Sequence, residues 1–368
     1  MNKILFLVSI LALFFVSCSS NKNYSFLVGT YTDTASQGIN LINFDSKTNS
    51  VALEKVITGV ENPSFVIANK SKTIVVAVEE TASNNGGKVT SFSYNKSTNT
   101  FTKINSFFTK GNHPCTVAFS KNENYVLVGN YSGGNLCVFP IDKFGKLSEN
   151  NQLIQYEGKS INVDRQEKSH VHSVVFHPTE NKIFVTDLGR DVIEIIPFDE
   201  NYKTFLQDRN AITIEVPKAT GPRHLVFNKA GTKAFVTFEL TNQIGIFEYK
   251  NYKLELIQTI NLSDDNTKSG SAAEVKLSKD EKFLYASVRG NNNFIAVLQL
   301  ENEVKVIQKT PTGKSPRNFI LTNNDKTILV ASQLSNTILV YNRDIKTGLL
   351  TPTSNEIVVN KPVYFCEF

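Results

Sequence analysis

Ionisable side chains recur at matching places of a five-residue phrase that the sequence repeats seven times. The copies occupy residues 62–66, 113–117, 170–174, 221–225, 271–275, 315–319 and 361–365. Their third residues are Ser64, Cys115, His172, Arg223, Ala273, Arg317 and Val363. Their first residues, which an extended strand places on the same face, are Asn62, His113, His170, Gly221, Ser271, Ser315 and Lys361. Imidazole exchanges protons and guanidinium binds oxyanions, so these two sets offer hydrolytic or anion-binding chemistry.

A further set comes from the end of the apolar run that follows each phrase. Its members are Tyr31, Glu80, Tyr131, Leu188, Glu239, Arg289 and Leu334. If the phrases surround one axis, a histidine, several arginines and glutamates converge at one mouth of a channel. Convergent ionisable groups are typical of active sites, although ion pairs that join neighbouring elements give the same pattern.

The spacing of the phrases indicates how they are arranged. Their second residues stand at 63, 114, 171, 222, 272, 316 and 362, so the steps are 44 to 57 residues. Each repeat holds short β-branched and aromatic runs separated by Gly, Asn, Ser and Pro, such as 117–119, 125–128 and 136–140. No long stretch has helical periodicity. The pattern predicts an all-β, seven-bladed β-propeller whose phrases are the innermost strands.

The end of the chain predicts how the ring closes. The seventh phrase is followed only by residues 366–368, whereas strand-like runs without a phrase occur near the front, at 25–29, 38–42 and 51–53. The C-terminal strand should therefore complete the N-terminal blade and leave no open sheet edge. We expect one propeller domain over residues 24–368.

The N-terminus resembles an export signal. Lys3 precedes an apolar stretch at 4–16 that is too short to span a bilayer comfortably, and Cys18 follows at the position of a bacterial lipoprotein cleavage site. Residues 1–18 are therefore predicted to be a lipoprotein-type signal peptide, and residues 19–23 a polar tether. An ordinary signal peptide or an uncleaved anchor is the alternative. We expect an exported bacterial lipoprotein, held at the membrane only by lipid on Cys18, in the periplasm or at the cell surface.

The remaining chemistry-bearing residues favour structural roles. Net charge is only +5, with lysines scattered among turns, so nucleic-acid binding is not expected. Cys115, Cys137 and Cys366 fit no zinc spacing and are expected to be small buried side chains, with a Cys115 nucleophile as an outside alternative. His170 and His172 could face one metal, but no third ligand has convincing spacing. His224 should alternate to the opposite face, and Asp187 should bond its own turn.

Several motifs together resemble the seven-bladed lactonase family, which includes propeller-type 6-phosphogluconolactonases and carboxy-cis,cis-muconate cyclases. The resemblance covers nearly all of residues 24–368. It rests on residues 28–32, 130–134, 170–174, 187–191, 221–227, 239–240, 272–275, 288–290 and 316–319. No one of these is specific, but the full set in this order is.

The resemblance implies a reaction and four catalytic residues. By motif, the family's His, Arg, Glu and second Arg correspond to His172, Arg223, Glu239 and Arg289. It implies hydrolysis of a sugar lactone such as 6-phospho-D-glucono-1,5-lactone, without metal or cofactor, by a protein that we expect to be a monomer. Glu239 or His172 would be the general base, and the arginines would hold the carbonyl oxygen or a substrate anion.

Other residues of the inner tiers are expected to bind the substrate. They are His170, Arg317, Tyr131 and Lys361. An export signal fits poorly with an intracellular sugar phosphate, so two alternatives stay open: a muconate-type lactonizing cyclase and a non-catalytic, surface-anchored binding propeller.

Overall fold

A computed structural model of the protein describes residues 23–33, 37–149, 152–201, 206, 208–263, 271–301 and 303–368. The predicted signal peptide, Cys18 and tether residues 19–22 lie outside these residues. Asn23, expected to end the tether, already belongs to the first strand. No helix among the described residues is long and apolar enough to cross a membrane.

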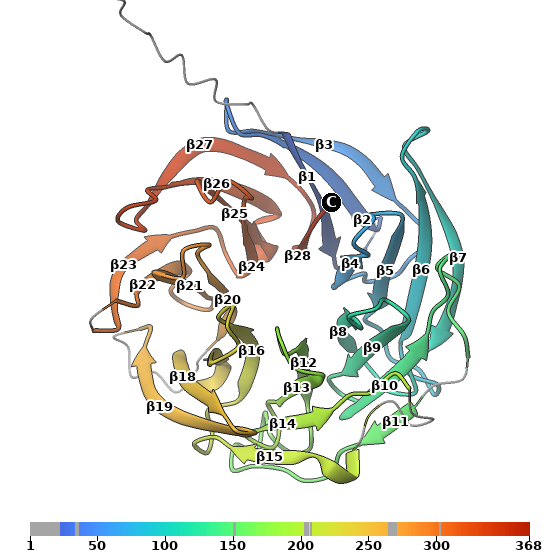
Figure 1. Ribbon diagram of the computed structural model, residues 1–368. Coiled ribbons are helices and arrows are strands. Elements are labelled where there is room, and N and C mark those ends of the chain that lie inside the picture. The colour runs from blue at the N-terminus through green and yellow to red at the C-terminus, as the bar shows by residue number, and fades with distance from the viewer. Residues whose placement is uncertain are drawn as a thin grey trace, which may run out of the picture.

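The chain forms seven four-stranded antiparallel sheets arranged around a centre, as predicted (Figure 1). The first blade contains β1 (Asn23–Thr30), β2 (Ile39–Asp45), β3 (Ser50–Ile57) and β28 (Pro362–Glu367). The second contains β4 (Val66–Ala68), β5 (Ile74–Glu79), β6 (Lys88–Asn95) and β7 (Thr100–Phe108). The third contains β8 (Pro114–Phe119), β9 (Tyr125–Asn130), β10 (Asn135–Pro140) and β11 (Gln152–Gln155). The fourth contains β12 (Val171–Phe176), β13 (Lys182–Asp187), β14 (Val192–Pro197) and β15 (Ile212–Glu215).

The last three blades repeat this order. The fifth contains β16 (Pro222–Phe227), β17 (Lys233–Phe238), β18 (Gln243–Lys250) and β19 (Lys253–Asn261). The sixth contains β20 (Ala272–Leu277), β21 (Phe283–Val288), β22 (Phe294–Gln299) and β23 (Lys305–Pro311). The seventh contains β24 (Pro316–Leu321), β25 (Thr327–Ser332), β26 (Thr337–Arg343) and β27 (Leu350–Val358). Helical structure in the described residues is limited to three 3₁₀ turns: η1 (Asp208–Asn210), η2 (Glu239–Thr241) and η3 (Gln333–Ser335).

The ring closes as the sequence predicted. The C-terminal strand β28 pairs antiparallel with β1, with Phe26 opposite Glu367 and Val28 opposite Phe365. The two ends of the chain thus share one blade (Figure 1). This pairing satisfies the backbone groups that an open inner edge of the first blade would expose.

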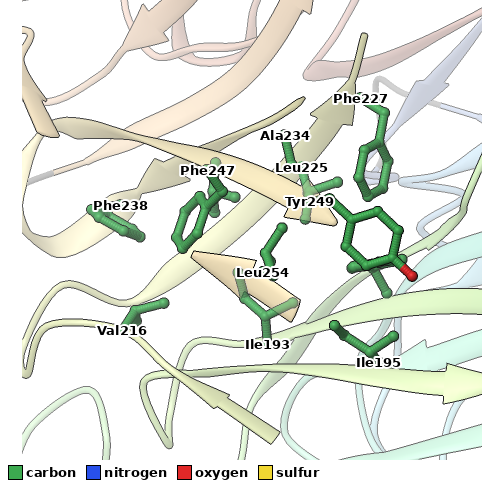
Figure 2. Close-up of a cluster of buried hydrophobic side chains, with 12 residues drawn as sticks. Ile193, Ile195, Val216, Leu225, Phe227, Ala234, Phe238, Phe247, Tyr249 and Leu254 are labelled. Atoms are coloured by element: carbon green, nitrogen blue, oxygen red, sulfur yellow. The ribbon is translucent and has the colours of Figure 1, made fainter. Parts of the chain in front are cut away.

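Apolar side chains from facing blades form the core. Figure 2 shows the cluster between the fourth and fifth blades, where Phe227 lies near Tyr249 and Ile193 near Leu254. The rings of Phe184 and Phe227 meet edge to face, with centroids 4.7 Å apart. Middle strands are covered on both faces, which is why all six residues of β13 are buried and its sequence lacks strict polar–apolar alternation.

The inner ring consists of the seven phrases. Strands β4, β8, β12, β16, β20, β24 and β28 stand nearest the centre (Figure 1). Just before these strands the backbone turns sharply in several blades. The first residue of the phrase has a positive φ at Asn62 (44°), His113 (53°), Gly221 (63°), Ser315 (57°) and Lys361 (45°). The expected alternation therefore does not extend to these first residues, because they are left-handed turn residues rather than extended strand.

Candidate functional site

A cavity of about 390 Å³ lies on the inner ring; we call it the site cavity. Its walls are Glu80, Cys115, Tyr131, Arg165, His172, Glu239, Ser271, Arg289 and Arg317. Five of the eight predicted catalytic and binding residues are in this set: His172, Glu239, Arg289, Arg317 and Tyr131. Third residues of three phrases and the ends of four of the following strands thus converge on one cavity.

A recurring β-bulge aims the third residues at the channel. The pairing register shifts between Pro114 and Thr116, between Val171 and Ser173, and between Pro316 and Asn318. Cys115, His172 and Arg317 are the extra residues at these shifts. A bulged residue is released from the ladder and its side chain is re-aimed, so the third and fourth residues of a phrase can both face the channel.

Glu239 is the centre of the charge network. It begins η2 directly after β17, and its backbone N–H donates to the Gly221 carbonyl at 2.8 Å. Its Oε2 lies 2.9 Å from Arg223 Nε, 3.3 Å from Arg289 Nη2 and 3.8 Å from His172 Nε2. Its Oε1 lies 2.7 Å from Arg165 Nη2. One carboxylate therefore faces three guanidinium groups and an imidazole.

These neighbours fix the protonation states. Burial alone would raise the pKa of Glu239, but Arg289 and Arg223 outweigh it and hold that pKa well below its usual range. Burial, reinforced by Arg223, lowers the pKa of His172 well below its usual value. At neutral pH the site therefore holds an ionised Glu239 beside a neutral His172 that can accept a proton.

Arg223 lies behind the cavity rather than in its wall. Its side chain is 3% exposed and it reaches the cavity through Glu239. Within the described residues, neither its Nε nor its Nη1 makes a hydrogen bond of acceptable geometry, although Nε is close to the Glu239 carboxylate. Burial lowers the pKa of Arg223, and Glu239 opposes this change. Arg223 thus acts on the cavity by holding Glu239 and biasing His172.

A second polar group forms the far wall of the site cavity. Arg317 Nη2 donates to Tyr31 Oη at 3.0 Å, and that hydroxyl donates to Glu80 at 2.9 Å. Ser64 Oγ also donates to Glu80. Tyr31, Glu80 and Ser64 all belong to the aligned tiers, but no feature of the sequence distinguishes them from their neighbours as site residues. Their contacts hold Arg317 in place.

Arg165 is a site residue that the sequence analysis did not identify. It lies in the loop between β11 and β12, and its Nη2 also donates to Tyr131 Oη at 3.3 Å. This residue belongs to no repeat, so no alignment of phrases could find it. The available signal was spacing: the step of 57 residues from position 114 to 171 is the longest and marks the extra loop.

Three other predicted site residues lie outside the cavity wall. His170 stacks on Tyr131 with ring centroids 4.3 Å apart, and its Nε2 lies 3.1 Å from Glu167 Oε2. His170 therefore packs against the Tyr131 ring and does not itself line the cavity.

Lys361 pairs with Asp33 at 2.7 Å. The turn conformation of Lys361 directs it away from the tier to which alternation had assigned it. Arg223, described above, is the third.

The expected structural roles hold for most of the remaining candidates. Asp187 Oδ1 accepts from the backbone N–H groups of His170 at 2.8 Å and Gly189 at 3.0 Å, as its turn predicted. Cys115 and Cys137 are buried, as expected, and burial raises the pKa of the Cys115 thiol, whereas Cys366 near the end of β28 is only partly buried. No group of three metal-ligating side chains occurs in the part of the chain that the structure describes.

Comparison with known proteins places the chain in a family. The sequence model described as "Lactonase, 7-bladed beta-propeller" matches residues 25–366. The protein belongs to this lactonase family. It is similar to a protein of Formosa agariphila named 6-phosphogluconolactonase, 30% identical over 341 residues that cover 90% of this chain and 96% of that one. A Bacillus subtilis protein of the same name is 28% identical over 91% of this chain and 96% of its own length.

A solved structure agrees with this assignment to the lactonase family. The periplasmic gluconolactonase of Pseudomonas aeruginosa superposes with a TM-score of 0.86 and 28% identity, covering 94% of this chain and 98% of that one. The family resemblance inferred from motifs is thus confirmed, as is the seven-bladed fold.

This lactonase-family propeller holds a second cavity farther along the inner strands, of about 310 Å³, which we call the axial cavity. The fourth residues of the phrases and the residues that directly follow the phrases line it, among them Phe65, Ile67, Val175, His224, Val226, Glu274, Lys276 and Tyr364. His224 was expected on the opposite face, but the bulge at Arg223 turns it toward the channel. Its Nδ1 lies 3.2 Å from Glu274 Oε2, and its ring meets the His172 ring edge to face at 5.4 Å.

Proposed function

We propose that this protein is a lactonase that hydrolyses the ester of a sugar lactone, with 6-phospho-D-glucono-1,5-lactone as the leading substrate. The observation that carries the proposal is the site cavity, where neutral His172 lies beside ionised Glu239 among several guanidinium groups. Membership of the lactonase family and the names of the relatives from Formosa agariphila and Bacillus subtilis support the same reaction.

Lactone hydrolysis needs a base for water, a cation for the developing oxyanion and a proton for the leaving alkoxide. His172 is favoured over Glu239 as the base, because Glu239 is held as a low-pKa carboxylate by its arginines. His172 Nε2 lies 3.8 Å from Glu239 Oε2, so the imidazolium formed by proton uptake would have an anion beside it. The same proton can then pass to the ring oxygen as the ester opens.

The arginines have separate tasks in this proposal. Arg289 and Arg317 line the cavity and would stabilise the carbonyl oxygen or bind a substrate anion. Arg223, which does not line it, would position Glu239. None of these steps requires a metal ion or an organic cofactor, and one protomer supplies all the residues named.

The charge of the cavity supports an anionic substrate. Among the described residues of the wall, Arg165, Arg289 and Arg317 stand against Glu80 and Glu239, an excess of one positive charge, and Arg223 adds a second directly behind the wall. Burial, together with Arg223 and Arg317, lowers the pKa of Arg289, while Glu239 opposes the change. A bound dianion would relieve this repulsion between cations.

The predicted signal peptide bears on where the reaction takes place. We infer export and a lipid anchor at Cys18, in keeping with the periplasmic gluconolactonase of Pseudomonas aeruginosa to which the chain is similar. An exported enzyme would meet sugar lactones outside the cytoplasm, so an unphosphorylated lactone is the main competing substrate. A lipoprotein is expected to incorporate labelled fatty acid, and Cys18→Ser is expected to abolish that incorporation.

The test is lactone hydrolysis by the purified protein, with 6-phosphogluconolactone and unphosphorylated gluconolactone measured side by side against spontaneous hydrolysis. We expect turnover of at least one lactone that falls at least 100-fold in His172→Asn. Turnover of neither lactone, with folded protein, would overturn the proposal. A muconate-type substrate would then be tested for cyclisation, and failure of that reaction would leave a binding propeller.

A further inference from the structure

The two oxygens of the Glu239 carboxylate have different kinds of partner. Oε2 faces Arg223, Arg289 and His172, whose side chains are 3%, 11% and 8% exposed. Oε1 has one ion-pair partner among the described residues, Arg165, and the Arg165 side chain is 41% exposed. One oxygen is therefore held by buried groups, whereas the other is covered by a side chain that reaches in from solvent.

The backbone that carries Arg165 is anchored independently of its guanidinium group. Its N–H donates to Asn162 Oδ1 at 3.2 Å. The next residue, Gln166, is fully buried, and its Nε2 donates to the Leu188 carbonyl at 2.8 Å. The side chain can consequently leave Glu239 by changing rotamer while the loop stays in place.

If the Arg165 side chain left Glu239, the carboxylate would still have cations beside it. Arg289 and Arg223 lower its pKa more strongly than Arg165 does, and both stay at Oε2. A phosphate oxygen would in turn replace the carboxylate as the acceptor of the Arg165 N–H groups, and guanidinium binds both anions in the same fork geometry.

We propose that Arg165 is the residue that recognises an anionic group on the substrate, exchanging Glu239 Oε1 for a phosphate oxygen when the ligand enters. The inference rests on the proposed lactonase function and adds the residue that distinguishes phosphorylated from unphosphorylated lactones. When Arg165 moves to the bound anion, Glu239 Oε1 loses this partner and becomes open to the cavity. Without an anion, Arg165 keeps Oε1 covered.

The test compares Arg165→Ala and Arg165→Lys with Lys159→Ala, which removes an exposed cation from the same loop. In Arg165→Ala, KM for the phosphorylated lactone should rise about 10- to 100-fold, while KM for the unphosphorylated lactone should change less than about 3-fold. Arg165→Lys should recover part of the difference, and Lys159→Ala should match the wild type. Equal effects on both lactones, or none, would overturn the proposal.

A binding measurement separates this proposal from the lactonase assignment. Titration calorimetry with inorganic phosphate needs no turnover, and we expect the Kd to rise at least about 10-fold in Arg165→Ala. Absence of hydrolysis by the wild type would refute only the function, provided that phosphate still binds through Arg165. An unchanged Kd in Arg165→Ala, or no phosphate binding to the wild type, would refute the role of Arg165.

Discussion

The site cavity and the axial cavity are lined by the same inner strands, yet their charges are organised in opposite ways. Around the axial cavity, Glu274 and Lys276 offset each other, and His224 is neutral because burial, reinforced by Arg223, lowers its pKa to about 4. Around the site cavity, the described residues carry an excess of positive charge. Locally balanced charge needs no ligand, whereas an unbalanced buried excess favours an incoming anion.

The carboxylates of Glu274 in the axial cavity and Glu239 in the site cavity also differ in how fully they are hydrogen-bonded. Glu274 accepts from the Val275 N–H at 3.0 Å and from Asn318 Nδ2, besides its contact with His224. Glu239 accepts from the loop residue Arg165, while the nearby Arg223 Nε lacks good hydrogen-bond geometry. The first carboxylate has the satisfied environment of a structural residue, whereas one oxygen of the second is paired with an exposed side chain.

Matched amide substitutions should separate the two cavities most strongly. Glu239→Gln leaves the guanidinium groups around it without their shared anion, so we expect the free energy of unfolding to fall by about 3–5 kcal/mol and kcat/KM at least 100-fold. Glu274→Gln should cost about 1–3 kcal/mol and leave kcat/KM within about 3-fold. Urea unfolding and lactone assays measure both. Equal loss of activity in the two variants would mean that the axial cavity also takes part in catalysis.

The next prediction concerns stability against pH in the axial cavity. The folded pKa of His224 is about 4, below its usual value of 6.5, so the unfolded chain binds more protons between these pH values. The contribution of His224 to the free energy of unfolding should thus be complete above pH 6.5 and fall by about 3 kcal/mol as the pH decreases to 4. His172, whose pKa is also lowered by burial, should add a loss in the same direction. In urea titrations, His224→Asn should remove the His224 part of this loss and leave the part that is due to His172. A wild-type curve that is already flat there would contradict the burial of a neutral His224.

The sequence predicted the ring, its closure and most of the site cavity because these depend on a repeated pattern. It did not predict the bulges, since the one-residue register shifts in β8, β12, β16, β20 and β24 depend on pairing that no phrase encodes. The positions of Lys361 and His224 were missed for related reasons: one is a left-handed turn residue and the other follows a bulge. Arg165 was missed because it lies in a loop outside the repeat.

A smaller effect is expected in the pH dependence of activity. The base must be unprotonated, and the lowered pKa of His172 should keep kcat/KM constant as the pH decreases through 6.5, where an ordinary histidine would begin to lose activity. Arg223→Ala removes a cation beside His172 and should move the acidic limb upward. Initial rates in overlapping buffers measure this shift. A wild-type limb at 6.5 would assign the base to a group other than His172.

The smallest effect is expected at Cys115, whose Sγ lies 4.0 Å from His172 Nδ1 in the site cavity. Because burial raises the pKa of this thiol, it should react slowly with iodoacetamide at pH 7.5. Cys115→Ala should alter kcat by less than about 3-fold. Complete loss of turnover in folded Cys115→Ala would instead indicate covalent catalysis by the thiol.

The most direct test of the central claim is a paired assay of His172→Asn and His224→Asn, two neighbouring histidines whose rings lie 5.4 Å apart but face different cavities. With the preferred lactone, kcat should fall about 10²- to 10⁴-fold in His172→Asn and stay within about 3-fold in His224→Asn. Full activity in His172→Asn, or a greater loss in His224→Asn, would contradict the assignment of lactone hydrolysis to the site cavity.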